Sequence, residues 1–284
     1  MAQCRDIIPK SRVVGGRNAP INLAPWQVLF LSPTVGGDYQ CGGSLINKDW
    51  VLTAGHCCYT PPISGSKIQI QYGGTNKNYM PFATTASKVV IHPQFNITSV
   101  DHDFCLVKLD QPAYQSATVR YATLATGYPH NGTKVIVSGW GLTNGSAPLS
   151  FATDLQYAVL SVVDRDTCAQ EWASRQSINK VDDTNICAQS STQSGCAGDS
   201  GGPLTVNGEL VGVVSYGVNQ CPLNYLPNVF GYVPSVRAWI DSTTKPQHNH
   251  VTYFPDGSFV IIDPELIDYP GGQYLQLPRV LAKF

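Results

Sequence analysis

The stretch Gly198-Asp-Ser-Gly-Gly-Pro203 sets a serine among glycines. Taken alone, this run could be an ordinary loop, and it also fits the short pattern G-x-S-x-G. Two further segments change its interpretation. Thr53-Ala-Gly-His-Cys57 follows the apolar Trp50-Val-Leu52, and Asp101-His-Asp-Phe-Cys-Leu-Val-Lys-Leu109 places acids beside a strand-like run. A histidine, an aspartate and a serine in this order are hard to explain as three unrelated loops.

Around these segments the chain is organised as short strands. Ile68, Ile70 and Tyr72 alternate with polar residues, which is the pattern of a half-buried strand. Similar apolar runs bounded by Gly-rich or Pro-rich breaks span 26–31, 134–137, 210–216 and 228–233. Only 234–242 has convincing helical spacing, with Val236, Trp239 and Ile240 on one face after a proline. This pattern predicts an all-β, antiparallel fold, as barrels or a sandwich, with a late helix.

Composition excludes several functions. The 284 residues carry a net charge of −1 and no basic block, which argues against nucleic-acid binding. No apolar run approaches the roughly 20 residues of a membrane helix. Nine cysteines favour an oxidising compartment, so we expect a secreted protein. Because 1–12 lacks the apolar region of a signal peptide, either the natural start lies upstream or export uses another route, and we expect the first.

Together the motifs resemble the chymotrypsin/trypsin family of serine peptidases, from about Val13 to Asp241. They comprise Val-Val-Gly-Gly at 13–16, Cys-Gly-Gly-Ser-Leu-Ile at 41–46, the histidine and serine segments, Ser-Gly-Trp-Gly at 138–141 and Ser-Tyr-Gly at 215–217. The resemblance implies two packed antiparallel β-barrels with a C-terminal helix. It divides the chain into an activation segment (1–12), a peptidase domain (13–241) and a C-terminal extension (242–284).

The resemblance also assigns catalytic roles. A serine hydroxyl needs a neighbouring base to attack an amide, so Ser200 is the expected nucleophile and His56 the base. Asp103 would orient the histidine; Asp101 is a nearby rival, but the family places the acid just before the apolar strand residues. The amides of Gly198 and Ser200 would form the oxyanion hole.

Two other groups of residues follow from the resemblance. Ser215 and Gly217 match the strand that pairs with the substrate backbone. Cleavage between Arg12 and Val13 would free an α-amino group to pair with Asp199, which implies a zymogen and an activating trypsin-like protease.

The family residue at the base of the primary specificity pocket corresponds to Ser194. A neutral serine there, rather than aspartate, favours a chymotrypsin-like preference for large apolar residues. A pocket-wall position that is often glycine is Asn228 here. Asparagine could narrow the pocket, favouring leucine or smaller groups, or offer a hydrogen bond to a polar side chain.

Three disulfides are implied by the resemblance: Cys41–Cys57, Cys168–Cys187 and Cys196–Cys221. Because the triad brings the segments of Cys58 and Cys105 together, we hypothesise a fourth bridge between them, against the alternative of two buried thiols. Cys4 has no clear partner. In the tail, Phe254-Pro-Asp-Gly-Ser-Phe259 indicates a turn between short strands.

No metal and no cofactor are expected. Between Asp49 and Asp101 there is no acidic residue for calcium, and the reaction needs none. The expected partners are protein or peptide substrates and protein protease inhibitors. The alternatives are a catalytically silent homologue acting as a binding scaffold and an α/β-hydrolase esterase. The intact triad argues against the first, and its His-first order argues against the second.

Overall fold

The computed structural model describes residues 14–60, 62, 64–143, 151–175, 179–218, 221–223, 225–245, 250–253 and 259–262. The chain divides into two units, one ending at Ile240 and the other beginning at Asp241. Each unit is considered by itself.

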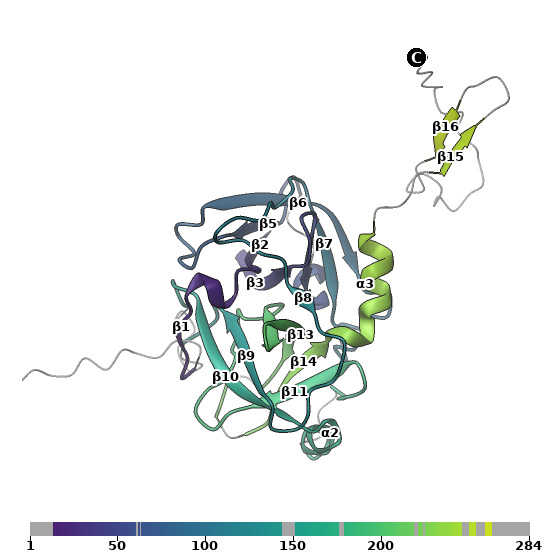
Figure 1. The fold of residues 1–284 in the computed structure, drawn as a ribbon. Coiled ribbons are helices and arrows are strands. Elements are labelled where there is room, and N and C mark those ends of the chain that lie inside the picture. The colour runs from purple at the N-terminus through teal and green to yellow at the C-terminus, as the bar shows by residue number, and fades with distance from the viewer. Residues whose placement is uncertain are drawn as a thin grey trace, which may run out of the picture. The chain divides into compact units, whose positions relative to one another are not determined.

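Six antiparallel strands form the first barrel (Figure 1). They are β2 (Gln27–Thr34), β3 (Gly37–Leu45), β4 (Trp50–Thr53), β5 (Gln69–Tyr72), β6 (Phe82–Ile91) and β7 (Cys105–Leu109). The ring runs β2-β3-β4-β7-β6-β5 and closes because β2 also pairs with β5. Its core includes Phe30, Leu52 and Leu106, which are almost inaccessible to solvent.

A second ring of six antiparallel strands follows in the sequence. It contains β9 (Lys134–Gly139), β10 (Gln156–Val163), β11 (Asn185–Gln189), β12 (Pro203–Val206), β13 (Glu209–Tyr216) and β14 (Asn228–Tyr232). The order β10-β11-β14-β13-β12-β9 closes through pairing of β9 with β10. Short strands β1 (Arg17–Asn18) and β8 (Thr123–Leu124) add to β10 and β13. The predicted pair of antiparallel barrels is confirmed.

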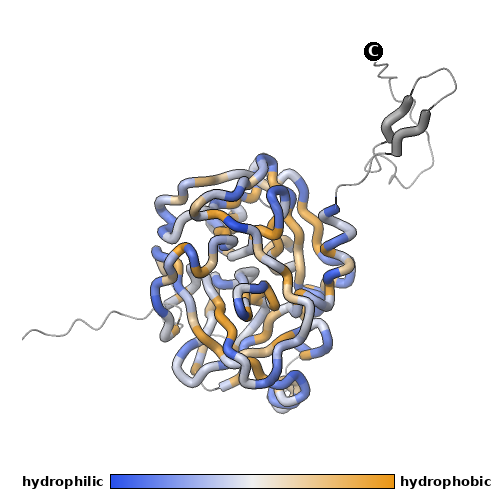
Figure 2. The backbone as a smooth tube through the Cα atoms, in the orientation of Figure 1, coloured by the Kyte–Doolittle hydropathy of each residue, from blue (hydrophilic) through white to orange (hydrophobic). Residues whose placement is uncertain are grey.

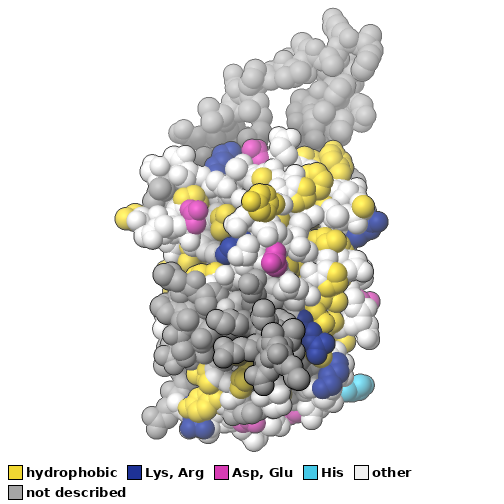
Figure 3. Space-filling view, turned by 90° about the vertical axis from the view of Figure 1, so that its left-hand side faces the viewer, with side chains coloured by type: hydrophobic (Ala, Val, Ile, Leu, Met, Phe, Trp, Pro, Cys, Tyr) yellow, Lys and Arg dark blue, Asp and Glu magenta, His cyan; other side chains and the backbone are white. Residues whose placement is uncertain are grey.

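Apolar residues follow the barrel strands, as the orange stretches of Figure 2 show. Each predicted strand run coincides with a strand of a barrel: β2, β5, β9, β13 or β14. Alternating burial along β10, from Gln156 to Val163, shows the period-2 pattern of a barrel wall. Figure 3 shows one face of the molecule. On it, basic and acidic side chains are scattered among apolar and neutral ones.

The helices are less well predicted. The expected helix at 234–242 is a 3₁₀ turn, η2 (Val233–Val236), that continues as α3 (Arg237–Thr244). The 3₁₀ turn η1 (Ile21–Leu23), α1 (Gly55–Tyr59) and α2 (Arg165–Ala173) were not predicted. The side chain of Asp164 caps α2 by accepting the Thr167 N–H, but only Cys168 and Trp172 of this helix are buried. Because α1 is a single turn and α2 buries only two residues, neither sequence shows the apolar period by which a helix is predicted.

All four proposed disulfides are present: Cys41–Cys57, Cys58–Cys105, Cys168–Cys187 and Cys196–Cys221. In the hypothesised bridge the Cα atoms of Cys58 and Cys105 lie 6.5 Å apart, within the usual range. Cys4 lies outside the described residues.

The second unit contains a hairpin, β15 (His250–Tyr253) and β16 (Phe259–Ile262), paired antiparallel with His250 opposite Ile262. The strands on either side of the predicted turn are therefore confirmed, while 254–258 lie outside the described residues.

Candidate active site

The glycines around Ser200 let its loop pack closely against the first barrel. Gly201 has φ +77°, and a Cβ there would overlap Thr53 Oγ1 and lie 2.6 Å from Gly42 O. The Gly42 N–H donates to Ser200 O at 2.7 Å. Because Thr53 is the first residue of the segment that carries His56, these contacts bring the serine loop and the histidine segment together across the two barrels.

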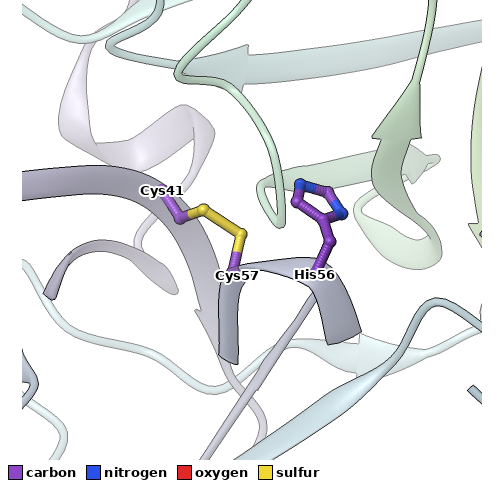
Figure 4. A group of neighbouring side chains, drawn as sticks. All are labelled: Cys41, His56 and Cys57. Carbon is purple, nitrogen blue, oxygen red and sulfur yellow. A yellow bond between two sulfur atoms is a disulfide. The ribbon is translucent and has the colours of Figure 1, made fainter. Parts of the chain in front are cut away.

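His56 lies in α1, which two disulfides fasten to the first barrel. Cys41–Cys57 joins α1 to β3, and Cys58–Cys105 joins it to β7. Asp103 lies just before β7, so the second bridge ties the histidine and aspartate segments to each other. In Figure 4 the His56 ring lies beside the Cys41–Cys57 bridge.

His56 and Asp103 form a hydrogen-bonded pair. Their Nδ1 and Oδ2 atoms lie 2.7 Å apart, and the side chain of Asp103 is only 1% exposed. Asp103 accepts two further hydrogen bonds: from the His56 backbone N–H to Oδ1 at 2.8 Å and from Ser215 Oγ to Oδ2 at 2.6 Å. Since an ionised carboxylate only accepts, Nδ1 carries the proton and Nε2 of a neutral ring remains a base.

Gly198, the other predicted oxyanion donor beside Ser200, has φ +91°. A Cβ at this position would lie 2.7 Å from the Phe151 ring, so the backbone there suits glycine. Within the described residues, neither the Gly198 nor the Ser200 N–H donates a hydrogen bond to the protein. Both donors are therefore available for an oxygen of a substrate.

Asp199, next to Ser200, is completely buried. Its carboxylate accepts hydrogen bonds from the Gly141 N–H at 2.8 Å and the Cys196 N–H at 3.0 Å. Burial raises the pKa of Asp199 to about 6, and the two hydrogen bonds act in the opposite direction. Neither of these described hydrogen-bond partners of Asp199 carries a positive charge that would compensate its carboxylate.

The start of the described chain is held beside the same loop. The Ser194 N–H donates to Val14 O, and Gln193 Nε2 donates to Gly15 O, each at 2.9 Å. Gly15 has φ +75°, and a Cβ there would overlap Thr192 O. Arg12 and Val13 themselves lie outside the described residues.

A cavity of about 230 Å³ extends from Ser200 into the second barrel. Its lining is more apolar than polar, and the apolar residues include Leu142, Ala197, Val214, Val218 and Phe230. Gly217 and Asn228 also line it. Ser194 is buried, and its Oγ lies 3.1 Å from Asn228 Oδ1. Asn228, rather than Ser194, therefore provides a polar side chain that lines the described part of the cavity.

Ser215 has a role that the sequence alone did not reveal. It was predicted as part of the substrate-pairing strand, and it does line the cavity. It also lies at an irregularity in the pairing of β13 with β14, between Val214 and Tyr216. Its hydroxyl meets Asp103, so the same residue contacts the aspartate of the first barrel.

Among the described residues, one group has possible metal-ligand atoms close together: Cys41, His56 and Cys57 (Figure 4). Both sulfurs are joined in a disulfide, so they offer no thiolate. No described helix is long and apolar enough to cross a membrane.

Comparison with known proteins agrees with this geometry. A model of the trypsin family matches residues 13–240. Trypsin theta of Drosophila melanogaster is 35% identical over 231 residues, which cover 81% of this chain and 86% of the relative. A trypsin of Sarcophaga bullata is 35% identical over 234 residues, covering 82% and 89% of the two chains. The chain therefore belongs to the trypsin family and is a serine endopeptidase.

Proposed function

We propose that this endopeptidase cleaves peptide bonds through an acyl-enzyme on Ser200, with His56 as general base and Asp103 as its orienting partner. The observation that carries the proposal is the 2.7 Å contact of His56 Nδ1 with Asp103 Oδ2. It fixes the ring tautomer in which Nε2 can accept a proton from the serine.

The proposed steps give each of these groups a role. Ser200 Oγ attacks the substrate carbonyl while His56 Nε2 takes the hydroxyl proton. The carbonyl oxygen becomes an oxyanion, which the N–H groups of Gly198 and Ser200 stabilise. Collapse of this tetrahedral intermediate breaks the C–N bond and leaves the acyl-enzyme ester on Ser200. The leaving amine takes the proton from His56. Water, deprotonated by His56, then hydrolyses the ester and restores Ser200.

We also propose that the chain is a zymogen activated by a trypsin-like protease that cuts after Arg12. Cutting there turns the Val13 nitrogen into an ammonium group, one residue before Val14, which is hydrogen-bonded to Ser194. The buried Asp199 carboxylate needs a compensating cation. The ion pair would stabilise the loop that carries the oxyanion donors.

The pocket is proposed to receive an uncharged side chain with an apolar body. None of the described residues that line the cavity is an Asp or Glu that could pair with lysine or arginine. Apolar walls contribute about 25 cal/mol per Å² of apolar surface removed from water.

Secretion and inhibitor binding complete the proposal. Four disulfides suit an oxidising compartment. Ser215 and Gly217 at the cavity give a backbone edge on which a substrate or an inhibitor loop can add as a strand. The intact set of His56, Asp103 and Ser200 disfavours the silent-scaffold alternative.

An Arg12→Gln variant tests activation. Treated with a trypsin-like protease beside the unaltered chain, it should keep Val13 uncut, as N-terminal sequencing would show. Its hydrolysis of a casein substrate should be at least about 100-fold slower, because Asp199 stays unpaired. Ser200→Ala, cut normally after Arg12, is the inactive control. Equal activity of the uncut variant and the cut protein would overturn the zymogen proposal.

A further inference from the structure

Asn228 bridges the two walls of the cavity. From β14 its Oδ1 lies 3.1 Å from Ser194 Oγ and accepts the Gly195 N–H at 3.2 Å, both on one wall. On the other side, a Cβ added to Gly217 would lie 2.9 Å from Asn228 Nδ2. The amide group therefore reaches across the pocket and limits its depth.

The orientation of this amide follows from its partners. A backbone N–H can only donate, so the group that faces Gly195 must be the oxygen of Asn228. The Nδ2 amino group then faces the Gly217 wall and the cavity. Within the described residues it has no acceptor in the protein.

Other polar side chains that line the cavity have partners elsewhere. The Ser215 hydroxyl donates to Asp103, and the Tyr216 hydroxyl donates to Lys180 O. Ser200 supplies the nucleophile. Among the described residues that line the pocket, Asn228 Nδ2 is thus the side-chain donor that is free for a substrate.

We infer that Asn228 makes the enzyme selective for a substrate residue with an apolar stem and an uncharged hydrogen-bond acceptor at its tip, of which glutamine is the best fit. This rests on the proposed function, because it names the substrate class of the same pocket. A donor buried without an acceptor costs about 1–3 kcal/mol, so side chains that leave Nδ2 unpaired are disfavoured.

Charge and size exclude the competing side chains. Lysine and arginine only donate, so they would oppose Nδ2. Glutamate could accept from Nδ2, but among the described lining residues there is no Lys or Arg to offset its buried charge. Aromatic side chains would meet the Asn228 amide before they are fully inserted.

The test compares kcat/KM for peptides that differ only in the residue before the scissile bond: Gln, Leu, Phe, Glu or Lys. The full chain is used after cleavage at Arg12, and active sites are counted with a fluorophosphonate that labels Ser200. We expect glutamine to exceed leucine about 10-fold, in line with one neutral hydrogen bond.

Asn228→Asp keeps an oxygen for Gly195 but replaces the donor with a second carboxylate oxygen. The ratio of kcat/KM for glutamine to that for leucine should fall to about 1. The kcat/KM for lysine should rise at least about 100-fold relative to that for leucine. Asn207→Asp makes the same chemical change at an exposed position between β12 and β13, and it should keep the glutamine preference. If Asn228→Asp does not fold, Asn228→Gly should instead favour phenylalanine over glutamine.

Leucine or phenylalanine cleaved as fast as glutamine by the unaltered enzyme would overturn the inference. A glutamine preference that persists in the Asn228→Asp or Asn228→Gly variant would also overturn it, because another group would then determine the preference. Failure of the proposed function looks different: Ser200 would not be labelled, and no peptide would be cleaved.

Discussion

At the scale of single residues, Asp103 is held by donors from both barrels. His56 contributes a ring N–H and a backbone N–H from the first barrel, and Ser215 contributes its hydroxyl from the second. These donors therefore replace the hydrogen bonds with water that the buried carboxylate has lost. Its contact with Nδ1 leaves Nε2 as the basic nitrogen of a neutral His56 ring.

Ser215→Ala removes one of these three donors. We expect kcat to fall about 10-fold, since a hydrogen bond to a charged group contributes about 1.5–3 kcal/mol, part of which water could replace. KM should change less, because the backbone of the substrate-pairing strand is kept. Steady-state kinetics on one peptide would measure both.

Ser235→Ala is the matched control, because that exposed hydroxyl donates to Tyr232 O and not to Asp103. An unchanged kcat in Ser215→Ala would show that the Asp103 contact has no catalytic effect.

The sequence predicted the chemical types of these residues but not all of their contacts. His56, Asp103 and Ser200 stand in short motifs of distinctive sequence, so a role for each could be proposed from the sequence. The placement of Asn228 in front of Ser194 depends on how β14 meets the 194–197 segment, more than 30 residues away in sequence. Local patterns carry no information about such a contact.

At the scale of elements, the barrel strands β2, β5, β9, β13 and β14 were predictable because short apolar or alternating runs, bounded by Gly-rich or Pro-rich breaks, mark them in the sequence. The helices α1 and α2 were not, since disulfides and a capping aspartate hold them rather than an apolar stripe. The Cys58–Cys105 bridge could be inferred only because the triad requires its two segments to meet.

The loop around Asp199 gives a pH dependence. In the intact chain burial raises the pKa of Asp199 to about 6, above the value near 3.8 of a free side chain. The folded state then binds this proton more tightly than the unfolded state. The free energy of unfolding of the intact chain should therefore fall as the pH rises from about 4 to about 6.

After cleavage, the Val13 ammonium should stabilise the charged form of Asp199. The free energy of unfolding of the cut chain should then no longer fall over this pH range. The difference in free energy of unfolding between cut and intact chains should widen over the same pH range, by up to roughly 3 kcal/mol at about 1.4 kcal/mol per pKa unit. Urea denaturation of Ser200→Ala protein at pH 4.5, 5.5 and 6.5 would measure it without self-digestion. Parallel profiles for the two forms would contradict the pairing.

At the scale of the whole molecule, the proposed catalytic groups are divided between the barrels. His56 and Asp103 belong to the first barrel, while Ser200, Ser215 and the pocket belong to the second. The close glycine contacts of Gly42 and Gly201 hold the two parts in register. In the proposed mechanism, catalysis therefore depends on the interface between two closed barrels, each of which supplies a rigid support.

The central claim is that Ser200 becomes the reactive nucleophile when Val13 is freed. The most direct measurement is reaction with a fluorophosphonate before and after cleavage at Arg12, with the modified residue located by mass spectrometry. The account predicts one adduct, on Ser200, in the cut protein, and little or none in the intact protein or in cut His56→Ala. An adduct at another residue, or none in folded protein with a free Val13 amino group, would contradict it.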